Sequence, residues 1–207
     1  MKTKLLMIPS KLNFIYEKTT INNPKSKWNK AYPGTRNLKS FSLPMILCNL
    51  SLEIEHLLDE KILKETMENC IHEVMDIFYR PELGIVLENV TIDNQLSDTF
   101  EGRVLDPGHA IEAMWFIMDL GVRLNRPGLI EKARDIALKM VKYGWDEKYG
   151  GIFYFMDRKG YPPQQLELDQ KLWWVHVETL ITLIKAYQLT GCKESLKWFN
   201  IIHEYTW

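Results

Sequence analysis

The stretch Ala110–Leu124, AIEAMWFIMDLGVRL, decides the fold class of this chain. Its apolar residues lie almost all round the helix that it predicts, as expected for a helix that is buried on most sides. The segment NRPG at 125–128 predicts a turn, and residues 129–143 then carry apolar side chains on one helical face only. Together these segments predict a hairpin of a buried inner helix and an amphipathic outer helix.

The same plan recurs on both sides of this hairpin. Further helices are predicted at 43–58, 63–79, 172–189 and 193–205. Two short segments, ELGIVLENV at 82–90 and YGGIFYFMD at 149–157, interrupt the helical period. They are rich in β-branched and aromatic residues and are bounded by Gly and charged residues, which predicts small β-hairpin arms between the helices.

An internal repeat relates these hairpins. Gly84 and Gly151 occupy the same place in the two arms, and His109 and His176 both stand where a mostly apolar helix begins. The differences 151 − 84 and 176 − 109 both equal 67. Subtracting 67 once more gives Ser42, at the start of the first predicted helix. The chain is therefore predicted to hold three units, each with an inner helix, a turn, an outer helix and an arm, the last unit without its arm.

Alternating apolar and amphipathic helices pack as an inner layer under an outer layer, which either closes as an α/α toroid or stays open as a solenoid. In a toroid the inner helices begin at one shared cavity, so the repeat predicts that His109 and His176 line a common pocket. We assign residues 38–207 to this all-α domain with its short β-hairpin arms. Residues 1–37 are rich in Asn, Lys and Pro and predict an irregular segment, with at most one short helix near 5–16.

Composition and charge exclude several classes of function. The chain has 26 Lys+Arg against 27 Asp+Glu, so it has no basic field for nucleic acid or an anionic membrane. No run of eighteen apolar residues is present that could span a membrane. The three cysteines, Cys48, Cys70 and Cys192, lie far apart without metal-ligand spacing. This pattern predicts reduced thiols in a cytoplasmic protein, and no metal site.

The segment DPGHAIE at 106–112 is the first candidate for chemistry. His109 and Glu112 are three residues apart and therefore share a helical face. A helix N-terminus lowers the pKa of a histidine, which favours the neutral imidazole that a general base needs. The alternative is a core histidine that is hydrogen-bonded to Glu112 and takes part in no reaction.

The segment KLWWVHVE at 171–178 is the second candidate. His176 and Glu178 would point about 160° apart on a regular helix. Both can face one cavity only if the helix begins here with an irregular turn. The pair Trp173-Trp174 by itself favours packing against a neighbouring helix.

Several motifs resemble those of one family. They are PGHAIE at 107–112, GGIFYF at 150–155 and KLWWVHVE at 171–178, together with LPMI at 43–46 and AYQLTG at 186–191. In this order they resemble successive motifs of the N-acylglucosamine 2-epimerases, over roughly residues 38–207. The resemblance implies an (α/α)6 barrel of six helical hairpins, of which this chain would hold about three. It also implies reversible inversion at C2 between N-acetylglucosamine and N-acetylmannosamine, with an amino sugar as the partner.

The resemblance also implies roles for single residues. His109 matches a catalytic histidine, Glu178 matches an essential glutamate, and Glu112 and His176 match substrate-binding positions. The chemistry requires no cofactor, although ATP is an activator of many family members. The family's second catalytic histidine would lie beyond Trp207, and its N-terminal arginine has no counterpart in 1–37. We therefore expect a truncated form with little activity alone, in which a second copy or a partner chain covers the open edge of the barrel.

Three alternatives stay open. A degenerate relative would bind a sugar or a partner without catalysis. A disaccharide 2-epimerase would share the fold and the His-x-x-Glu motif, although the histidine of Trp-Trp-x-His-x-Glu fits the N-acylglucosamine branch better. An unrelated helical-repeat scaffold would lack the ordered set of motifs.

Overall fold

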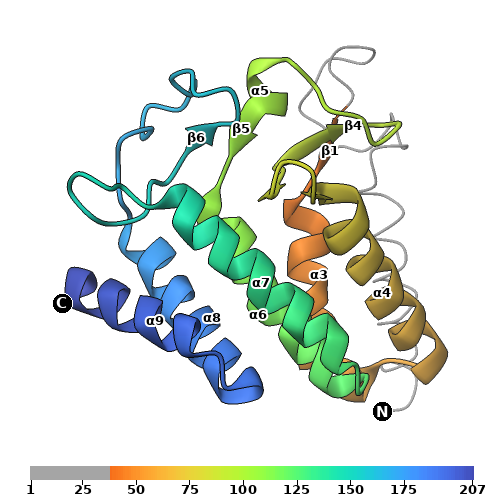
Figure 1. Cartoon of the computed structure of the whole chain (residues 1–207). Coiled ribbons are helices and arrows are strands. Elements are labelled where there is room, and N and C mark those ends of the chain that lie inside the picture. The colour runs from red at the N-terminus through yellow and green to blue at the C-terminus, as the bar shows by residue number, and fades with distance from the viewer. Residues whose placement is uncertain (1–37) are drawn as a thin grey trace.

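The computed structural model describes residues 38–207, which form three helical hairpins (Figure 1). The hairpins are α3 (Ser42–Glu53) with α4 (Glu60–His72), α6 (Pro107–Arg123) with α7 (Pro127–Gly144), and α8 (Trp173–Thr190) with α9 (Lys193–Thr206). The helices predicted from the sequence are confirmed, with small shifts at their ends. The irregular segment and short helix predicted for 1–37 lie outside the described residues.

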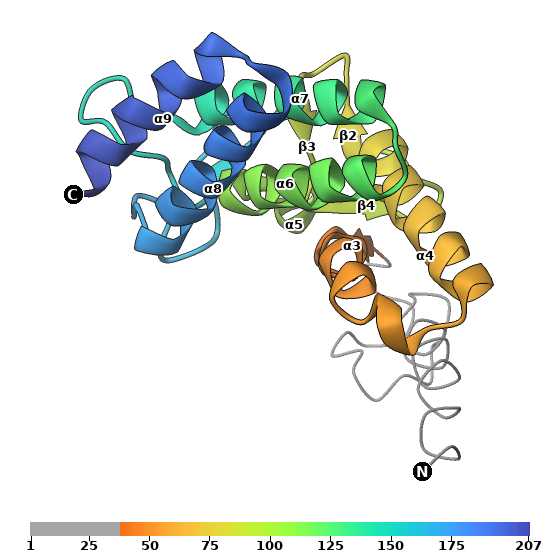
Figure 2. The same ribbon diagram turned by 90° about the horizontal axis from the view of Figure 1, so that it is seen from below.

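The helices lie in two layers (Figure 2). Helix α6 packs between α3 and α8 in the inner layer, and the outer helices α4, α7 and α9 each pack against their own hairpin partner. In this view the inner helices α8, α6 and α3 follow one another along an arc (Figure 2). The predicted fold class, a partial α/α toroid, is therefore confirmed.

The central helix α6 shows why the sequence folds in this way. The side chain of Asp106 caps its N-terminus by accepting a hydrogen bond from the His109 backbone N–H at 3.0 Å, and Pro107 occupies the first turn. Its apolar residues are buried on nearly all sides, among them Ile111, Met114 and Ile117. The continuous apolar pattern thus reflects contact with α3, α7 and α8 together.

Short strands connect the hairpins. The pairs are β1 (Leu38–Ser40) with β4 (Asn89–Thr91), β2 (Tyr79–Arg80) with β3 (Ile85–Val86), and β5 (Val104–Leu105) with β6 (Met156–Asp157), all antiparallel. A short helix, α5 (Phe100–Arg103), precedes β5. The first predicted arm is a hairpin, β2–β3. The second predicted arm makes one bridge, Trp145 to Ile152, and its end pairs with β5 instead of folding back on itself.

The repeat has a different spacing from the predicted one. The N-cap residues of α6 and α8 are Asp106 and Leu172, and the outer helices α7 and α9 begin at 127 and 193, so both differences equal 66. In the arms, Gly84 N–H donates to the Arg80 carbonyl and Gly150 N–H to the Asp146 carbonyl, each at 2.8 Å. Gly150, and not Gly151, is therefore the counterpart of Gly84.

A π-helical turn explains why no constant spacing holds. In the first hairpin α4 continues into η2 (Glu73–Phe78), a π-helix, so that 13 and 6 residues make one outer helix. The corresponding helix α7 has 18 residues, one fewer. A π turn accommodates an inserted residue within a helix. The spacing between equivalent residues of the first two units therefore changes along the outer helix. It is 67 where the two helices begin, at 60 and 127, and 66 where they end, at 78 and 144.

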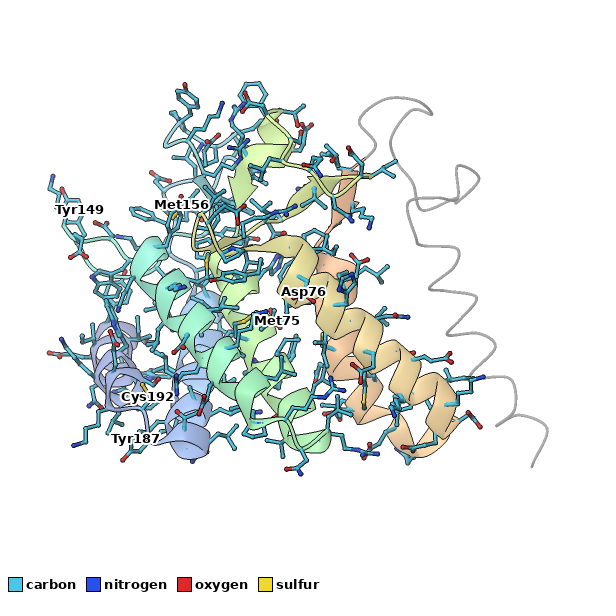
Figure 3. The ribbon with its side chains drawn as sticks, turned by 45° about the vertical axis from the view of Figure 1, so that its right-hand side comes forward. Met75, Asp76, Tyr149, Met156, Tyr187 and Cys192 are labelled. Carbon is cyan, nitrogen blue, oxygen red and sulfur yellow. The ribbon has the colours of Figure 1, made fainter. Side chains whose placement is uncertain are left out.

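The three cysteines all lie within the described residues. Cys48 and Cys70 are buried, and Cys192 is half-buried at the turn between α8 and α9 (Figure 3); none of the three is in a disulfide. Tyr149 projects into solvent from the loop after α7 (Figure 3). Within residues 38–207, no helix is long and apolar enough to cross a membrane.

Candidate active site

The inner surface of the arc carries a stripe of polar and aromatic side chains on α6. From Pro107 to Gly121 every residue of this helix is buried except four, which recur every three or four positions. These are His109, Glu112, Trp115 and Asp119. Such spacing puts them on one face of α6, where each of the four side chains is half-buried.

The neighbouring helix α8 presents a matching stripe. Trp115 Nε1–H donates a hydrogen bond to Glu178 Oε2 at 2.8 Å, and Lys185 Nζ lies 2.5 Å from Asp119 Oδ2. Lys185 also lies over the Trp115 ring, 4.4 Å from its centre. These contacts hold the two stripes beside each other, so that Glu178 shares the inner surface with the polar residues of α6.

His109 is held at the start of α6 by two carboxylates. Its Nδ1 lies 3.3 Å from both carboxylate oxygens of Glu88 and 3.4 Å from Asp106 Oδ2. Glu88 comes from the segment between β3 and β4, which belongs to the preceding repeat unit. Within residues 38–207 the ring makes its hydrogen bonds through Nδ1, and the His109 side chain keeps 30% of its surface exposed.

Two aromatic side chains complete the surroundings of His109. The Trp174 ring lies 5.5 Å from the His109 ring, and Tyr154 meets Trp174 edge to face at 5.7 Å. A Cβ at Gly108 would come within 2.7 Å of Trp174, which explains the glycine before the histidine. Trp174 thus packs across to the neighbouring helix and forms one wall beside the imidazole, whereas Trp173 is 75% exposed and does not pack in the way that was expected of the pair.

The ionisation of His109 differs from the prediction. Burial by itself lowers its pKa, but the hydrogen bond and charge of Glu88, with the charges of Asp106 and Glu112, outweigh burial and raise the pKa to about 9. The helix N-terminus was expected to favour neutral imidazole; three carboxylates reverse that expectation because opposite charge nearby stabilises the cation. His109 is therefore an imidazolium at neutral pH, and a proton donor.

Glu112 and Glu178 occupy equivalent positions on α6 and α8, since 178 − 112 equals the structural repeat of 66. Burial, and then the charge of Glu178, raise the pKa of Glu112 to about 7. Glu178 accepts the hydrogen bond from Trp115. Glu112 is thus about half protonated near neutral pH, while Glu178 accepts a hydrogen bond. The pair can offer one hydrogen-bond donor and one acceptor to a hydroxylated ligand.

His176 is not part of this group, contrary to the expectation of a shared pocket. The structural repeat pairs it with Ala110, and one position along a helix is a rotation of about 100°. Its Nδ1–H donates to the Leu172 carbonyl at 2.8 Å, and its Nε2 accepts from the Ile152 N–H at 3.0 Å. The ring is buried and stacks on Tyr205 of α9. His176 therefore ties an arm to the helices, with neither nitrogen left for a substrate.

Sequence reasoning missed Glu88 and the roles of Trp115 and Tyr154. Glu88 is the only charged residue between Ile85 and Val90 and directly follows three buried residues, which is a weak signal of a carboxylate with a role. Trp115 stands three residues after Glu112 and four before Asp119, on the same helical face. Within the described residues, no group of three or more His, Cys, Asp or Glu is arranged to hold a metal ion.

The titrating groups of this site predict how stability depends on pH. Folding raises the pKa of His109 to about 9 and those of Asp106 and Glu112 to about 7. Ordinary values in an unfolded chain are about 6.5, 3.9 and 4.3, so the native state binds these protons more tightly. Stability therefore falls as pH rises, from about 4 to 7 for the carboxyls and from about 6.5 to 9 for His109.

Urea unfolding at a series of pH values from 5 to 9 measures this effect. The free energy of unfolding is expected to decrease with pH. Glu112→Gln should flatten the part of the curve between pH 5 and 7, whereas Glu131→Gln, at an exposed position of α7, should leave it unchanged. A free energy of unfolding that increases over this range would contradict the assignment.

These residues form a cluster of ionisable side chains, and a candidate site, on the inner face of a partial α/α toroid. A family model for N-acylglucosamine 2-epimerase (GlcNAc 2-epimerase) matches residues 6–207, nearly the whole chain, and the chain belongs to this family. The match begins well before residue 38, where the motifs placed the start of the resemblance.

Curated relatives agree with this assignment. The N-acylglucosamine 2-epimerase of Rattus norvegicus is 34% identical over 176 residues, which cover 84% of this chain and 42% of the relative. The corresponding human protein is 32% identical over 176 residues, 41% of its length. A D-mannose isomerase of Pseudomonas cannabina pv. alisalensis is 27% identical over 116 residues. The chain thus spans about two-fifths of the length of the N-acylglucosamine 2-epimerases it matches.

Solved structures share the fold. A D-mannose isomerase superimposes with a TM-score of 0.67 at 18% identity, over 88% of this chain and 47% of that structure. A cellobiose 2-epimerase from Bacillus thermoamylovorans superimposes with a TM-score of 0.62 at 22% identity, over 80% and 39%. At such identities the likeness supports the fold.

Proposed function

We propose that the surface between α6 and α8 is half of a sugar 2-epimerase site, in which His109 exchanges a proton with C2 of N-acetylmannosamine or N-acetylglucosamine. The observation that carries the proposal is the gathering of His109, Glu112 and Glu178 on one exposed face, with a proton donor held against carboxylates. Family membership supports the reaction type, and the similarity to N-acylglucosamine 2-epimerases supports the amino sugar.

The chemistry starts from the open-chain sugar, whose C1 aldehyde makes the C2 hydrogen acidic. A base removes the C2 proton, and the electron pair of the C–H bond moves to the carbonyl oxygen, which gives an enolate. Protonated His109 then delivers its proton to C2 on its own face; in the opposite direction, its neutral form takes that proton. A protonated Glu112 would donate a hydrogen bond to the developing oxyanion, and Glu178 would accept one from a sugar hydroxyl.

Inversion needs a second proton-transferring group on the opposite face of C2. His176 is unsuited to this task because both of its nitrogens are engaged. We therefore propose that this chain alone exchanges the C2 proton on the His109 face and interconverts the two sugars slowly. This is the sense in which we expect it to have little epimerase activity.

The test is to incubate the full chain with N-acetylmannosamine in deuterated water, with and without ATP, and to follow deuterium at C2 by NMR. We expect incorporation without matching formation of N-acetylglucosamine. Glu178→Gln should reduce incorporation about ten- to a hundredfold, because a hydrogen bond to a charged group is worth about 1.5–3 kcal/mol. The matched control is Glu131→Gln on the outer helix α7.

Two results would reject the proposal. Equal incorporation in the wild type and in Glu178→Gln would remove Glu178 from the site. Sugar binding without any incorporation would favour the degenerate relative, which binds a sugar and does not catalyse. Replacing N-acetylmannosamine by mannose or cellobiose in the same experiment separates the amino-sugar proposal from a disaccharide or simple-sugar specificity.

The edge of the inner layer bears on assembly. On α3, Ile46 is 48% exposed and Leu50, one helical turn later, is 37% exposed. We propose that a second copy of the chain or a partner chain covers this edge. Sedimentation of the purified chain over a range of concentrations is expected to show association, and a single monomeric species would contradict it.

A further inference from the structure

We infer that Glu88, with Asp106 behind it, is the residue that positions His109, fixing the imidazole through Nδ1 so that Nε2 is the nitrogen that meets the sugar. This inference rests on the proposed function, because it assigns a task to a residue beside the same site. It concerns a side chain that no motif of the sequence pointed to.

The geometry around Nδ1 is the first support. Both oxygens of Glu88 lie 3.3 Å from Nδ1, and Asp106 Oδ2 lies 3.4 Å away. The Glu88 side chain is 12% exposed and that of Asp106 is 1% exposed. Asp106 Oδ1 accepts the hydrogen bond from the His109 backbone N–H, which places Oδ2 toward the ring. Two largely buried carboxylates therefore converge on one nitrogen.

The backbone that carries Glu88 is fixed on both sides. The Glu88 carbonyl accepts a hydrogen bond from the Phe41 N–H at 2.9 Å, and Leu87 N–H donates to the Phe78 carbonyl at 3.0 Å. The next side chain, Asn89, donates to the Glu101 carbonyl at 3.0 Å. Leu87 is fully buried. A carboxylate on a backbone held in this way has little freedom to leave His109, as positioning requires.

The consequence for His109 follows from its two nitrogens. A carboxylate beside one ring nitrogen keeps the proton there and fixes the ring plane, which leaves the other nitrogen to exchange protons. The groups that face the ring with charge are Glu88, Asp106 and Glu112. Of these, only Glu88 and Asp106 lie beside Nδ1, and Asp106 is already committed to capping α6. Glu88 is therefore the group that can be substituted to test the orientation of His109 without removing the cap of α6.

Two substitutions separate charge from orientation. Glu88→Gln keeps an oxygen that can accept from Nδ1–H but removes the negative charge, whereas Glu88→Ala removes both. Glu82→Gln, at an exposed position of the turn between β2 and β3, is the matched control. Each variant is made in the full chain, and circular dichroism with a thermal melt reports whether it is folded.

The first measurement is an NMR titration of the His109 imidazole, assigned by loss of its signal in His109→Asn. In the wild type it should titrate near pH 9. In Glu88→Gln the midpoint should move down by about one unit or more, because an opposite charge within about 4 Å shifts a pKa by 1–3 units. Glu82→Gln should titrate as the wild type does. An unchanged midpoint in Glu88→Gln would overturn the inference.

The second measurement is deuterium exchange into C2 of N-acetylmannosamine as a function of pH. For Glu88→Gln the midpoint of the rate profile should move down with the titration, with the rate at its optimum within about tenfold of the wild type. Glu88→Ala should lower kcat by about a hundredfold or more with KM little changed, since orientation acts on the reacting state. If folded Glu88→Ala showed the same rate and pH profile as the wild type, the inference would be overturned.

The two proposals fail in different ways. Absence of exchange in the wild type rejects the proposed function, and the titration still decides whether Glu88 holds His109. Exchange in the wild type, with both Glu88 variants unchanged, rejects the positioning role of Glu88 and leaves the proposed function in place.

Discussion

His109→Asn is expected to lower deuterium exchange into C2 of N-acetylmannosamine by about a hundred- to ten-thousandfold. The loss has this size because proton transfer by a positioned side chain contributes about 10²–10⁴ to rate, and asparagine cannot exchange a proton near neutral pH. Asparagine keeps polar atoms near the place of Nδ1, so the contact with Glu88 can be retained and the fold should survive.

The control for this variant is His56→Asn, at an exposed position of the 3-10 turn η1 (Glu55–Leu57). It should leave the exchange rate unchanged. Melting temperature and circular dichroism of both variants separate a loss of chemistry from a loss of fold. Exchange at the wild-type rate in folded His109→Asn would place the base elsewhere.

His176→Ala is expected to destabilise the fold by about 2–5 kcal/mol. The substitution leaves the buried Ile152 N–H without its acceptor, and an unsatisfied buried donor costs about 1–3 kcal/mol. It also removes the stacking on Tyr205 and leaves a cavity in the packing between α8 and α9. Because total domain stability is about 5–15 kcal/mol, the loss should be large in a urea titration.

The comparison variant is His72→Ala, an exposed residue of α4 whose pairing with Asp76 is solvated. It should change the free energy of unfolding by less than about 1 kcal/mol. Under conditions where His176→Ala remains folded, it should still exchange deuterium into C2. If His176→Ala were stable but had lost deuterium exchange, His176 would instead take part in proton transfer.

The sequence predicted the fold better than the site. Helix positions and layers followed from apolar periodicity, because contact with several neighbours leaves α6 apolar all round while one wet face leaves α7 amphipathic. The register of the repeat could not follow from spacing alone. The extra residue of the π turn at 73–78 is locally accommodated and leaves no mark in the apolar pattern.

An error of one residue in the register between the second and third units had a large consequence for the predicted site. With a period of 67, His176 becomes the counterpart of His109; with 66, Glu178 becomes the counterpart of Glu112. The rotation of about 100° per residue then sends His176 to the outer layer and keeps Glu178 on the inner surface. The estimate that His176 and Glu178 point apart on a regular helix is in accord with this outcome.

The ionisation of His109 was unpredictable from its neighbours in sequence. The helix N-terminus is a local feature and favours neutral imidazole, but Glu88 lies 21 positions away along the chain. Its effect exists only after β3, β4 and α6 have packed together. Pairing across such a distance has no periodic signature, so the carboxylate that decides the charge of His109 emerges only from the tertiary structure.

The contact between Glu88 and His109 crosses from one repeat unit to the next. Neither unit holds this pair by itself, because Glu88 follows the first arm and His109 begins the second inner helix. The contact therefore belongs to the junction between two units, and a rearrangement that separated them would remove it.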